Sequence, residues 1–256
     1  MPFRQHFDCL WCGRRWDTRD DEDIEGWAGL CPECLGKADD NGFLRARLRA
    51  GLRERAAAMA GDWEDWYLRR GRFSRGPVHD GAWTMELDQA TRWLDALPLS
   101  GTIVELGAGM GWWSGLLAEK GELWVYDDDA TSLEAARKRL LAHRLMAHLH
   151  ERDPLASPDK GVDAVFAAYL LGRAESETEL DARVTAARAW LRPGGSLVLV
   201  EAAPTEDESL VMGPAGPLWP RSAARLSERI TAAGFDAVEF ERTRAAFVLG
   251  HAVRSD

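Results

Sequence analysis

The stretch GTIVELGAGMGWWSGLLAEKGELWVYDDD, residues 101–129, decides the fold of this chain. Residues 102–106 form a short apolar run before a glycine-rich turn, which predicts a buried parallel strand. The pattern is helical over residues 112–120, and Gly121 is a candidate C-cap. A second strand at 123–126 stops at a run of aspartates. The order strand, glycine turn, helix, strand and acid predicts half of a nucleotide-binding fold.

The glycine turn has a spacing that suits a ligand with a ribose. Gly107, Gly109 and Gly111 occupy every second position. Glycine tolerates positive φ and lets a ligand approach the bare backbone, and the following helix N-terminus offers unpaired N–H groups. A carboxylate at the end of the second strand can accept hydrogen bonds from a ribose diol.

The run VELGAGMG, residues 104–111, differs from the G-x-G-x-x-G of dinucleotide enzymes. It resembles motif I of class I S-adenosylmethionine (SAM)-dependent methyltransferases. The resemblance implies that Glu105 lies near the amino acid part of the cofactor and that Asp127 binds the ribose hydroxyls. The alternative is a glycine turn of another α/β protein, which Glu105 before the turn and Asp127 after it disfavour.

The same resemblance continues along the chain. A third strand is predicted at residues 146–150. Asp153, in the loop after it, inherits the contact with the adenine amino group, although a D-P turn also makes an ordinary loop. The run LRPGGSLVLVE, residues 191–201, resembles the R-P-G-G strand of the family. The cofactor-binding residues implied by the resemblance are Glu105, Gly107, Ala108, Gly109, Gly111, Asp127, Asp128, Asp153 and Tyr169.

The resemblance covers residues 63–254 and implies a fold. We expect an α/β domain with a Rossmann-like, seven-stranded mixed sheet. Helices are expected at 84–97, 130–147, 180–191 and 221–233. Strands at 237–242 and 245–252 are expected to form a closing antiparallel hairpin, with the last strand inserted beside the fifth.

A fourth strand is predicted at residues 162–169, and the loop after it faces the methyl group in the family. Here it reads AYLLGR, residues 168–173, without the histidine or the Asn/Asp-Pro-Pro-aromatic tetrad of many relatives. Methylation of a nucleobase nitrogen or a protein glutamine through that tetrad is therefore disfavoured. We expect catalysis by proximity and orientation, with Tyr169 and Arg173 as candidate catalytic residues and His79, beside Asp80, as a candidate base.

An aromatic segment precedes motif I. In many relatives this region folds over the cofactor and lines the acceptor pocket. The candidate pocket residues are Trp63, Trp66, Tyr67, Phe73, His79 and Trp83, although each is also suited to core packing.

The cysteines predict a metal site. They form two C-x-x-C pairs, Cys9 with Cys12 and Cys31 with Cys34, at a spacing typical of a structural zinc site. A disulfide is the main alternative, but no feature indicates an oxidising compartment, and neither pair has the βαβ context of a redox motif. Because residues 1–40 are few and polar, we expect zinc to stabilise them.

Three segments follow from these features. We predict a zinc-ribbon-like module at 1–40, a basic helix with an aromatic cap segment at 41–85, and a methyltransferase domain at 86–256. The arginines of the basic helix either form a solvated face, which we prefer, or contact phosphate beside the zinc module.

Composition bounds the remaining possibilities. The net charge of −10 argues against a general nucleic-acid binder, and there is no apolar run long enough to span a membrane and no signal peptide. We expect a cytoplasmic enzyme that methylates a small-molecule acceptor and releases S-adenosylhomocysteine (SAH). The alternatives are an RNA methyltransferase, because a zinc ribbon before such a domain resembles ribosomal RNA guanine methyltransferases, and a non-catalytic SAM-binding protein. The acceptor atom and the oligomeric state are not predicted.

Overall fold

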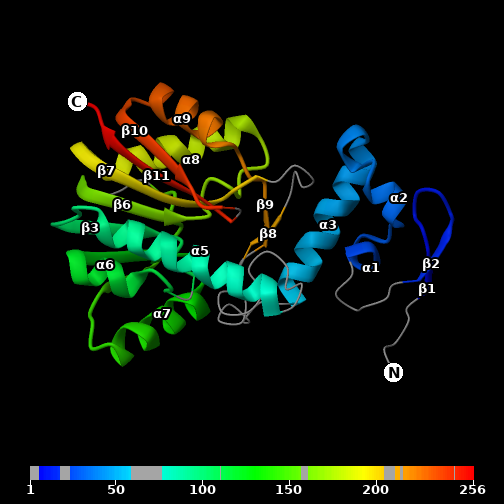
Figure 1. Cartoon of the computed structure of the whole chain (residues 1–256), viewed down its shortest axis with the longest axis horizontal. Coiled ribbons are helices and arrows are strands. Elements are labelled where there is room, and N and C mark those ends of the chain that lie inside the picture. Colours follow the sequence, from blue (N-terminus) through cyan, green and yellow to red (C-terminus); the bar gives the residue numbers. More distant parts are fainter. Residues whose placement is uncertain are drawn as a thin grey trace. The chain divides into compact units, whose positions relative to one another are not determined.

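The computed structural model describes residues 6–17, 24–58, 77–109, 111–156, 161–204, 211–213, 216–244 and 246–256 (Figure 1). The chain divides into two compact units. The first comprises Met1–Asp62 and Pro214–Pro217, and the second comprises Trp63–Gly213 and Leu218–Asp256. The three segments predicted from the sequence, with boundaries after residues 40 and 85, remain predictions.

The first unit is built around the cysteines. Its elements are β1 (His6–Asp8), β2 (Arg15–Asp17), α1 (Ile24–Ala28), α2 (Pro32–Leu35), η1 (Ala38–Asp40) and α3 (Gly42–Ala58). β1 and β2 pair antiparallel, and the Asn41 side chain caps α3 by accepting from the N–H groups of Phe43 and Leu44. The buried core is small and consists of Cys9, Ala28, Leu30, Cys31, Cys34, Ala38 and Leu44.

The second unit contains a seven-stranded mixed sheet, as the sequence predicted. Its strands are β3 (Thr102–Leu106), β4 (Glu122–Asp127), β5 (His148–Glu151), β6 (Val162–Ala168), β7 (Leu191–Ala202), β10 (Phe235–Arg242) and β11 (Phe247–Arg254). They lie in the order β10-β11-β7-β6-β3-β4-β5. β11 is antiparallel to both β7 and β10, so the last strand inserts beside the fifth strand of the sheet, which is β7. The other described strands are β8 (Val211–Gly213) and β9 (Gly216–Leu218).

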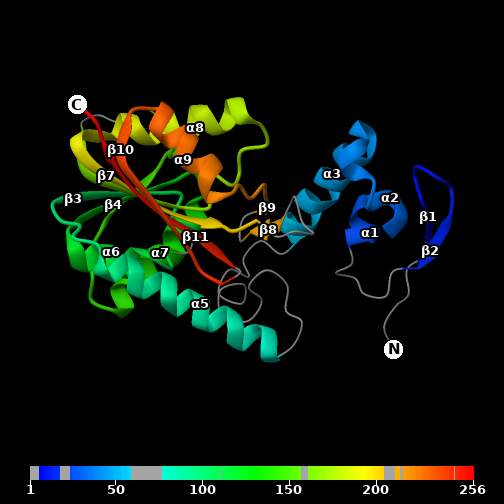
Figure 2. The same cartoon turned by 45° about the horizontal axis from the view of Figure 1, so that its top comes forward.

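Helices cover both faces of this sheet (Figures 1 and 2). The helices are α5 (Pro77–Ala96), α6 (Ser114–Lys120), α7 (Ala130–Ala142), α8 (Glu177–Trp190) and α9 (Ala223–Ala232). Side chains of α5, α6 and α7 share one buried cluster with Ile103 of β3, whereas those of α8 and α9 share another with Val104. Successive residues of β3 thus point to opposite faces, which explains why both Ile103 and Val104 are apolar.

Two predicted helices differ from the structure by five residues or more at one end. α5 begins at Pro77 and not at residue 84, because proline is compatible with the first turn of a helix. α7 ends at Ala142, five residues before the predicted end, and Arg144 has a positive φ of 60°. The helical pattern of the sequence continues past this point, but the chain turns there to begin β5.

Gly121 is the C-cap of α6, as predicted, and its N–H donates to the carbonyl of Leu117 at 3.3 Å. Its φ of −173° is extended backbone, so the left-handed conformation is not what requires glycine. A Cβ atom at this position would lie 2.3 Å from the carbonyl oxygen of Gly101. The close approach of the segments that precede β3 and β4 therefore excludes a side chain.

We predict that Gly121→Ala lowers the free energy of unfolding of the second unit by about 1–3 kcal/mol, the usual cost of overpacking. Gly115→Ala is the matched control in the same helix, because the nearest atom to its Cβ would be Leu145 Cδ1 at 3.8 Å. This control should be neutral or stabilise by up to about 1 kcal/mol through helix propensity. Urea unfolding of both variants measures the difference, and equal effects would show that the Gly101 contact does not constrain this position.

Candidate functional site

The segments after β3, β4 and β5 are tied together at one edge of the sheet. Because these strands are parallel, their carboxyl ends lie on the same side. The Gly107 N–H donates to the carbonyl of Tyr126 at 2.8 Å, and the Arg152 N–H donates to the carbonyl of Asp127 at 2.9 Å. The structure therefore brings the glycine turn, the acids after β4 and the loop of Asp153 to a common edge.

The glycine turn uses the conformation that only glycine adopts readily. Gly107, Gly109 and Gly111 have φ values of 70°, 53° and 76°. A Cβ atom on Gly111 would also lie 2.7 Å from the Cα and Cβ atoms of Ala136 in α7. The turn consequently leaves bare backbone at the edge of the sheet, and Ala108 lies between the first two glycines.

Asp127 holds the glycine turn. Its Oδ2 accepts from the Gly109 N–H at 2.9 Å, and its Oδ1 accepts from the Asp129 N–H at 3.0 Å. Burial raises the pKa of this carboxyl, although the N–H groups of Asp129 and Gly109 and the charge of Arg173 oppose the rise. Asp128 is exposed, and Asp129 caps α7. The predicted acid, Asp127, thus contacts the predicted glycine turn directly.

Glu105 is buried inside the sheet below the turn, with 1% of its surface exposed. The Ser114 hydroxyl donates to its Oε2 at 2.5 Å, whereas Oε1 has no hydrogen-bond partner among the described residues. Burial raises the pKa of Glu105 to about 8, and the charge of Asp127 contributes to the rise. Glu105 therefore carries a carboxyl with free acceptor capacity.

Asp153 lies two residues after β5 and is exposed. Its Oδ1 accepts from the Leu155 N–H at 2.9 Å, which is the hydrogen bond of an Asx-turn. No hydrogen bond to Asp153 Oδ2 is found among the described residues.

The loop after β6 is strained and firmly held. Tyr169 has a positive φ of 59° and is buried, and its N–H donates to the carbonyl of Val200 at 2.8 Å. Glu201, at the end of β7, accepts from the N–H groups of Leu171 and Gly172 at 2.8 and 2.9 Å. Burial raises the pKa of Glu201 to about 7 against these two hydrogen bonds and the charges of Arg173 and Arg221.

Two residues of this edge, Ser114 and Glu201, are not among the site residues predicted from the sequence. Glu201 was interpreted only as the end of a structural strand. An acid that ends a buried apolar strand is the signal that could have identified it, as it identified Asp127. Ser114 has no such signal, because only the folded chain brings it to Glu105.

The predicted pocket residues before motif I are placed differently. His79 and Trp83 belong to α5, but their side chains are not among those described. Trp63, Trp66, Tyr67 and Phe73 lie outside the described residues.

The cysteines of the first unit converge. The sulfur atoms of Cys9, Cys12, Cys31 and Cys34 all lie within 4.8 Å of one another, and none is in a disulfide. The Cys31 N–H donates to the Cys9 sulfur at 3.3 Å. Burial raises the pKa of Cys9, but N–H groups of Cys12, Cys31 and Trp11 outweigh it and lower the pKa to about 6. The cluster could hold a metal ion.

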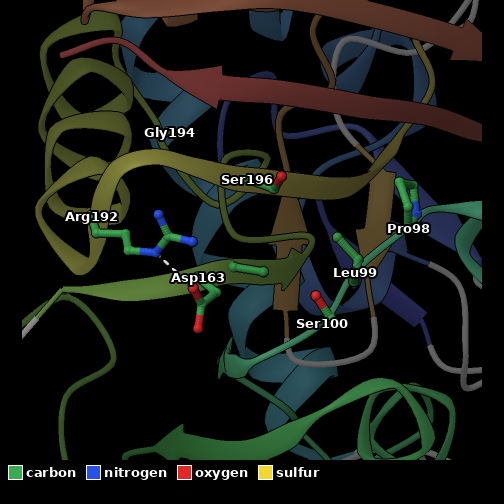
Figure 3. A pocket seen from close by; sticks show the side chains of 8 residues that line it. Pro98, Leu99, Ser100, Asp163, Arg192, Gly194 and Ser196 are labelled. Atoms are coloured by element: carbon green, nitrogen blue, oxygen red, sulfur yellow. Dashed lines mark hydrogen bonds and ion pairs between the residues drawn. The ribbon is translucent and has the colours of Figure 1, made fainter.

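A cavity of about 170 Å³ lies at the other edge of the sheet (Figure 3). It is lined by the amino-terminal parts of β6 and β7 and by the residues before β3, and Arg192 pairs across it with Asp163 at 2.6 Å. Ligands of open α/β sheets bind beyond the carboxyl ends of the strands. This cavity is therefore not part of the candidate site.

Comparison with known families identifies the class of protein. Residues 103–195 match a family described as "Methyltransferase domain". This match includes the glycine turn, Asp127 and the loop after β6. No curated protein matches the chain.

Solved structures share the fold at low sequence identity. A DhpI–SAH complex is 20% identical with a TM-score of 0.61, and the alignment covers 88% of this chain and 99% of that one. 1,6-Didemethyltoxoflavin-N1-methyltransferase from Burkholderia thailandensis, with bound 1,6-didemethyltoxoflavin and SAH, is 17% identical with a TM-score of 0.56, covering 80% and 91%. Magnesium protoporphyrin IX methyltransferase from Synechocystis PCC 6803, with bound SAM, is 19% identical with a TM-score of 0.55, covering 78% and 95%.

Residues 103–195 therefore match a methyltransferase domain, and the chain shares the fold of solved SAM-dependent methyltransferases. It is an enzyme of the methyltransferase type. Among the described residues, no helix is long and apolar enough to cross a membrane.

We predict that Glu105 makes the stability of the second unit depend on pH. Between its unfolded pKa of about 4.5 and its folded pKa of about 8, the folded chain retains a proton that the unfolded chain has lost. The free energy of unfolding should fall as pH rises through this window, by at most about 1.4 kcal/mol per pH unit from this group. Glu105→Gln can still accept from Ser114 but does not titrate, so the variant should lose less stability than the wild type.

Urea unfolding of both proteins without cofactor at pH 5 and pH 7.5 measures this difference. Glu201 is present in both proteins, so its own titration cancels in the comparison. Identical pH dependence in the two proteins would show that Glu105 is ionised in the folded chain throughout this range.

Proposed function

We propose that the protein transfers the methyl group of SAM to a small-molecule acceptor and releases SAH. The observation that carries this proposal is the hydrogen bond from the Gly109 N–H to Asp127, which joins the glycine turn and the acid at the carboxyl edge of the sheet. The sulfonium of SAM supplies an electrophilic methyl group, so the acceptor needs mainly alignment.

Asp127 is proposed to bind the ribose of the cofactor. Each of its oxygens accepts one backbone N–H, and a carboxylate oxygen has two lone pairs. Capacity therefore remains for the hydroxyl donors of a ribose. The backbone of the glycine turn would pass beneath the cofactor, at Gly107, Ala108, Gly109 and Gly111. Asp128 and Asp153 would contact the adenosine part.

Glu105 is proposed to complement the ammonium group of the methionine part. The Oε1 atom has no partner among the described residues, and a buried carboxyl is poorly solvated. A positive charge nearby favours the ionised form, so an ammonium group would lower the raised pKa of Glu105.

The small-molecule acceptor rests on two kinds of support. The toxoflavin and protoporphyrin methyltransferases, which share the fold, are named for small-molecule acceptors. The net charge of −10 also disfavours a polyanionic partner. Tyr169, which is held at the end of β6, is proposed to face the reacting methyl group.

We predict that Asp127→Ala weakens SAH binding by about 1.5–3 kcal/mol, because a charge-assisted hydrogen bond to the ribose is lost. Isothermal titration calorimetry of SAH measures the change. Asp236→Ala is the control, because Asp236 is exposed on β10, the outermost strand on the side of the sheet away from β4. Unchanged affinity in Asp127→Ala would place the ribose contact on another residue, with Asp128 next in line.

The acceptor class is tested with SAM labelled on its methyl group. The protein is incubated with a lysate of the source organism, and the RNA, protein and small-molecule fractions are then counted. We expect label in the small-molecule fraction, with much less for Asp127→Ala at low SAM concentration. Label in RNA or protein would refute the small-molecule acceptor, and release of no SAH would refute methyl transfer.

We also propose that the four cysteines bind a structural zinc ion. Zinc–sulfur bonds of about 2.3 Å in a tetrahedron place the sulfur atoms about 3.8 Å apart. The sulfur atoms of Cys12 and Cys31 are 3.7 Å apart, and the whole cluster lies within 4.8 Å. Four thiolates leave no coordination position for a substrate, so the site would be structural.

We predict one zinc ion per chain by elemental analysis, and loss of the first unit's fold when a chelator removes it. The small core of this unit includes three of the cysteines, so the metal supplies much of its stability. Circular dichroism and limited proteolysis monitor the change, and added Zn²⁺ but not Mg²⁺ should reverse it. If the first unit keeps its fold after a chelator has removed all metal, a structural zinc site is refuted.

A further inference from the structure

The loop after β6 is fixed by contacts that do not involve its last residue. The carbonyl of Leu170 accepts from Arg183 Nη1 at 3.3 Å, and the carbonyl of Gly172 accepts from the Trp219 N–H at 2.6 Å. Glu201 accepts from the two N–H groups between them. A Cβ atom on Gly172 would lie 2.9 Å from Glu201 Oε2, so glycine is needed for this approach. The backbone that leads into Arg173 therefore has one conformation.

Arg173 lacks the protein partners that a desolvated guanidinium normally has. Among the described residues, none forms a hydrogen bond or an ion pair with it. Removal from water lowers the pKa of Arg173, although the charges of Asp127, Asp128 and Glu201 oppose this and that of Arg183 adds to it. The side chain is nevertheless partly exposed, so a small molecule can reach it.

Arg183 shows the contrast within the same part of the fold. Its guanidinium donates to Glu179 Oε1 at 2.6 and 3.2 Å and to the carbonyl of Leu170. Arg183 is thus satisfied by protein groups, whereas Arg173 has no such partner in the part of the chain that the structure describes.

The acids near Arg173 are already used elsewhere. Both oxygens of Glu201 accept N–H groups of the loop, and both oxygens of Asp127 accept N–H groups of the glycine turn and of Asp129. These carboxylates therefore attract Arg173 at longer range without occupying its N–H donors. A planar guanidinium with five donors is suited to bind a carboxylate or a phosphate group through two parallel hydrogen bonds.

We propose that Arg173 is an oxyanion-binding residue of the methyl-transfer site, which binds a carboxylate or phosphate group of a small molecule and is positioned by the contact of Glu201 with the loop. This inference rests on the proposed function and deepens it. The same oxyanion could come from two sources, the carboxylate of the cofactor's methionine part or an acidic group on the acceptor.

The first experiment separates these sources with two nucleosides. SAH carries the amino acid carboxylate, whereas 5′-methylthioadenosine has the same adenosine without it. If the cofactor supplies the oxyanion, Arg173→Gln should weaken SAH binding by about 10- to 100-fold and leave methylthioadenosine binding unchanged. Arg173→Lys keeps the charge but not the planar fork, and should lie between wild type and Arg173→Gln.

The second experiment tests the acceptor as the source, with inorganic phosphate as the probe. Phosphate is titrated into the protein alone and into its SAH complex, and binding is followed by ³¹P line broadening. If the acceptor supplies the oxyanion, both nucleosides should bind Arg173→Gln normally, and phosphate binding should be lost. Arg192→Gln is the matched control, because Arg192 pairs with Asp163 at the opposite edge of the sheet (Figure 3). Its phosphate binding should equal that of the wild type.

Two results would overturn the inference. Equal weakening of SAH and methylthioadenosine by Arg173→Gln would assign Arg173 a structural role. No effect of Arg173→Gln on either nucleoside or on phosphate would exclude an oxyanion contact. Failure of the wild type to bind SAH would refute the proposed function instead, and the phosphate titration of the protein alone would still decide on Arg173.

Discussion

The structure of the second unit depends on the position of one carboxylate. Asp127 ends β4 and accepts from the N–H groups of Gly109 and Asp129, so it fixes both the turn after β3 and the start of α7. The segments that follow the neighbouring parallel strands β3 and β4 therefore meet at Asp127. Burial makes this carboxylate costly, and the two N–H groups offset that cost. The same atoms can therefore serve the fold and the proposed ribose contact.

A second buried acid, Glu201, repeats this arrangement on the other side of the sheet's centre. It ends β7 and accepts from two consecutive N–H groups of the loop after β6. Both acids thus hold a loop that contains a residue of positive φ, Gly109 in one case and Tyr169 in the other. Glycine adopts this conformation readily, whereas Tyr169 is strained there. Strained residues persist where surrounding contacts fix them, and such positions cluster at functional sites. The contacts of Asp127 and Glu201 with these two loops lie at the edge of the sheet where methyl transfer is proposed.

Much of the fold could be predicted because its signals are local. Each of these signals predicts the structure of its own short segment: the apolar runs of β3, β4 and β6, the glycine spacing and the acid that ends β4. The insertion of β11 beside β7 was predicted from family resemblance and is confirmed by the register of the sheet. Helix ends were less accurate, as α5 and α7 show, because a helical pattern does not report where tertiary packing turns the chain. Gly121 illustrates the same limit, since its close neighbour Gly101 lies 20 residues earlier in the chain, just before β3.

The sequence by itself determined the class of fold, the resemblance to methyltransferases and the pairing of the cysteines in two C-x-x-C motifs. Spacing along the chain specifies the glycine turn, the strand–helix alternation and these motifs. Only the tertiary structure decided which groups lack partners and which are satisfied. Ser114 meets Glu105, and Glu201 meets the loop after β6, across distances of 9 and about 30 residues in the chain. Arg183 donates to protein acceptors, and Arg173 has none among the described residues, although both are ordinary arginines in the sequence. Desolvation and hydrogen bonding depend on neighbours in space, and that is why these properties required the folded chain.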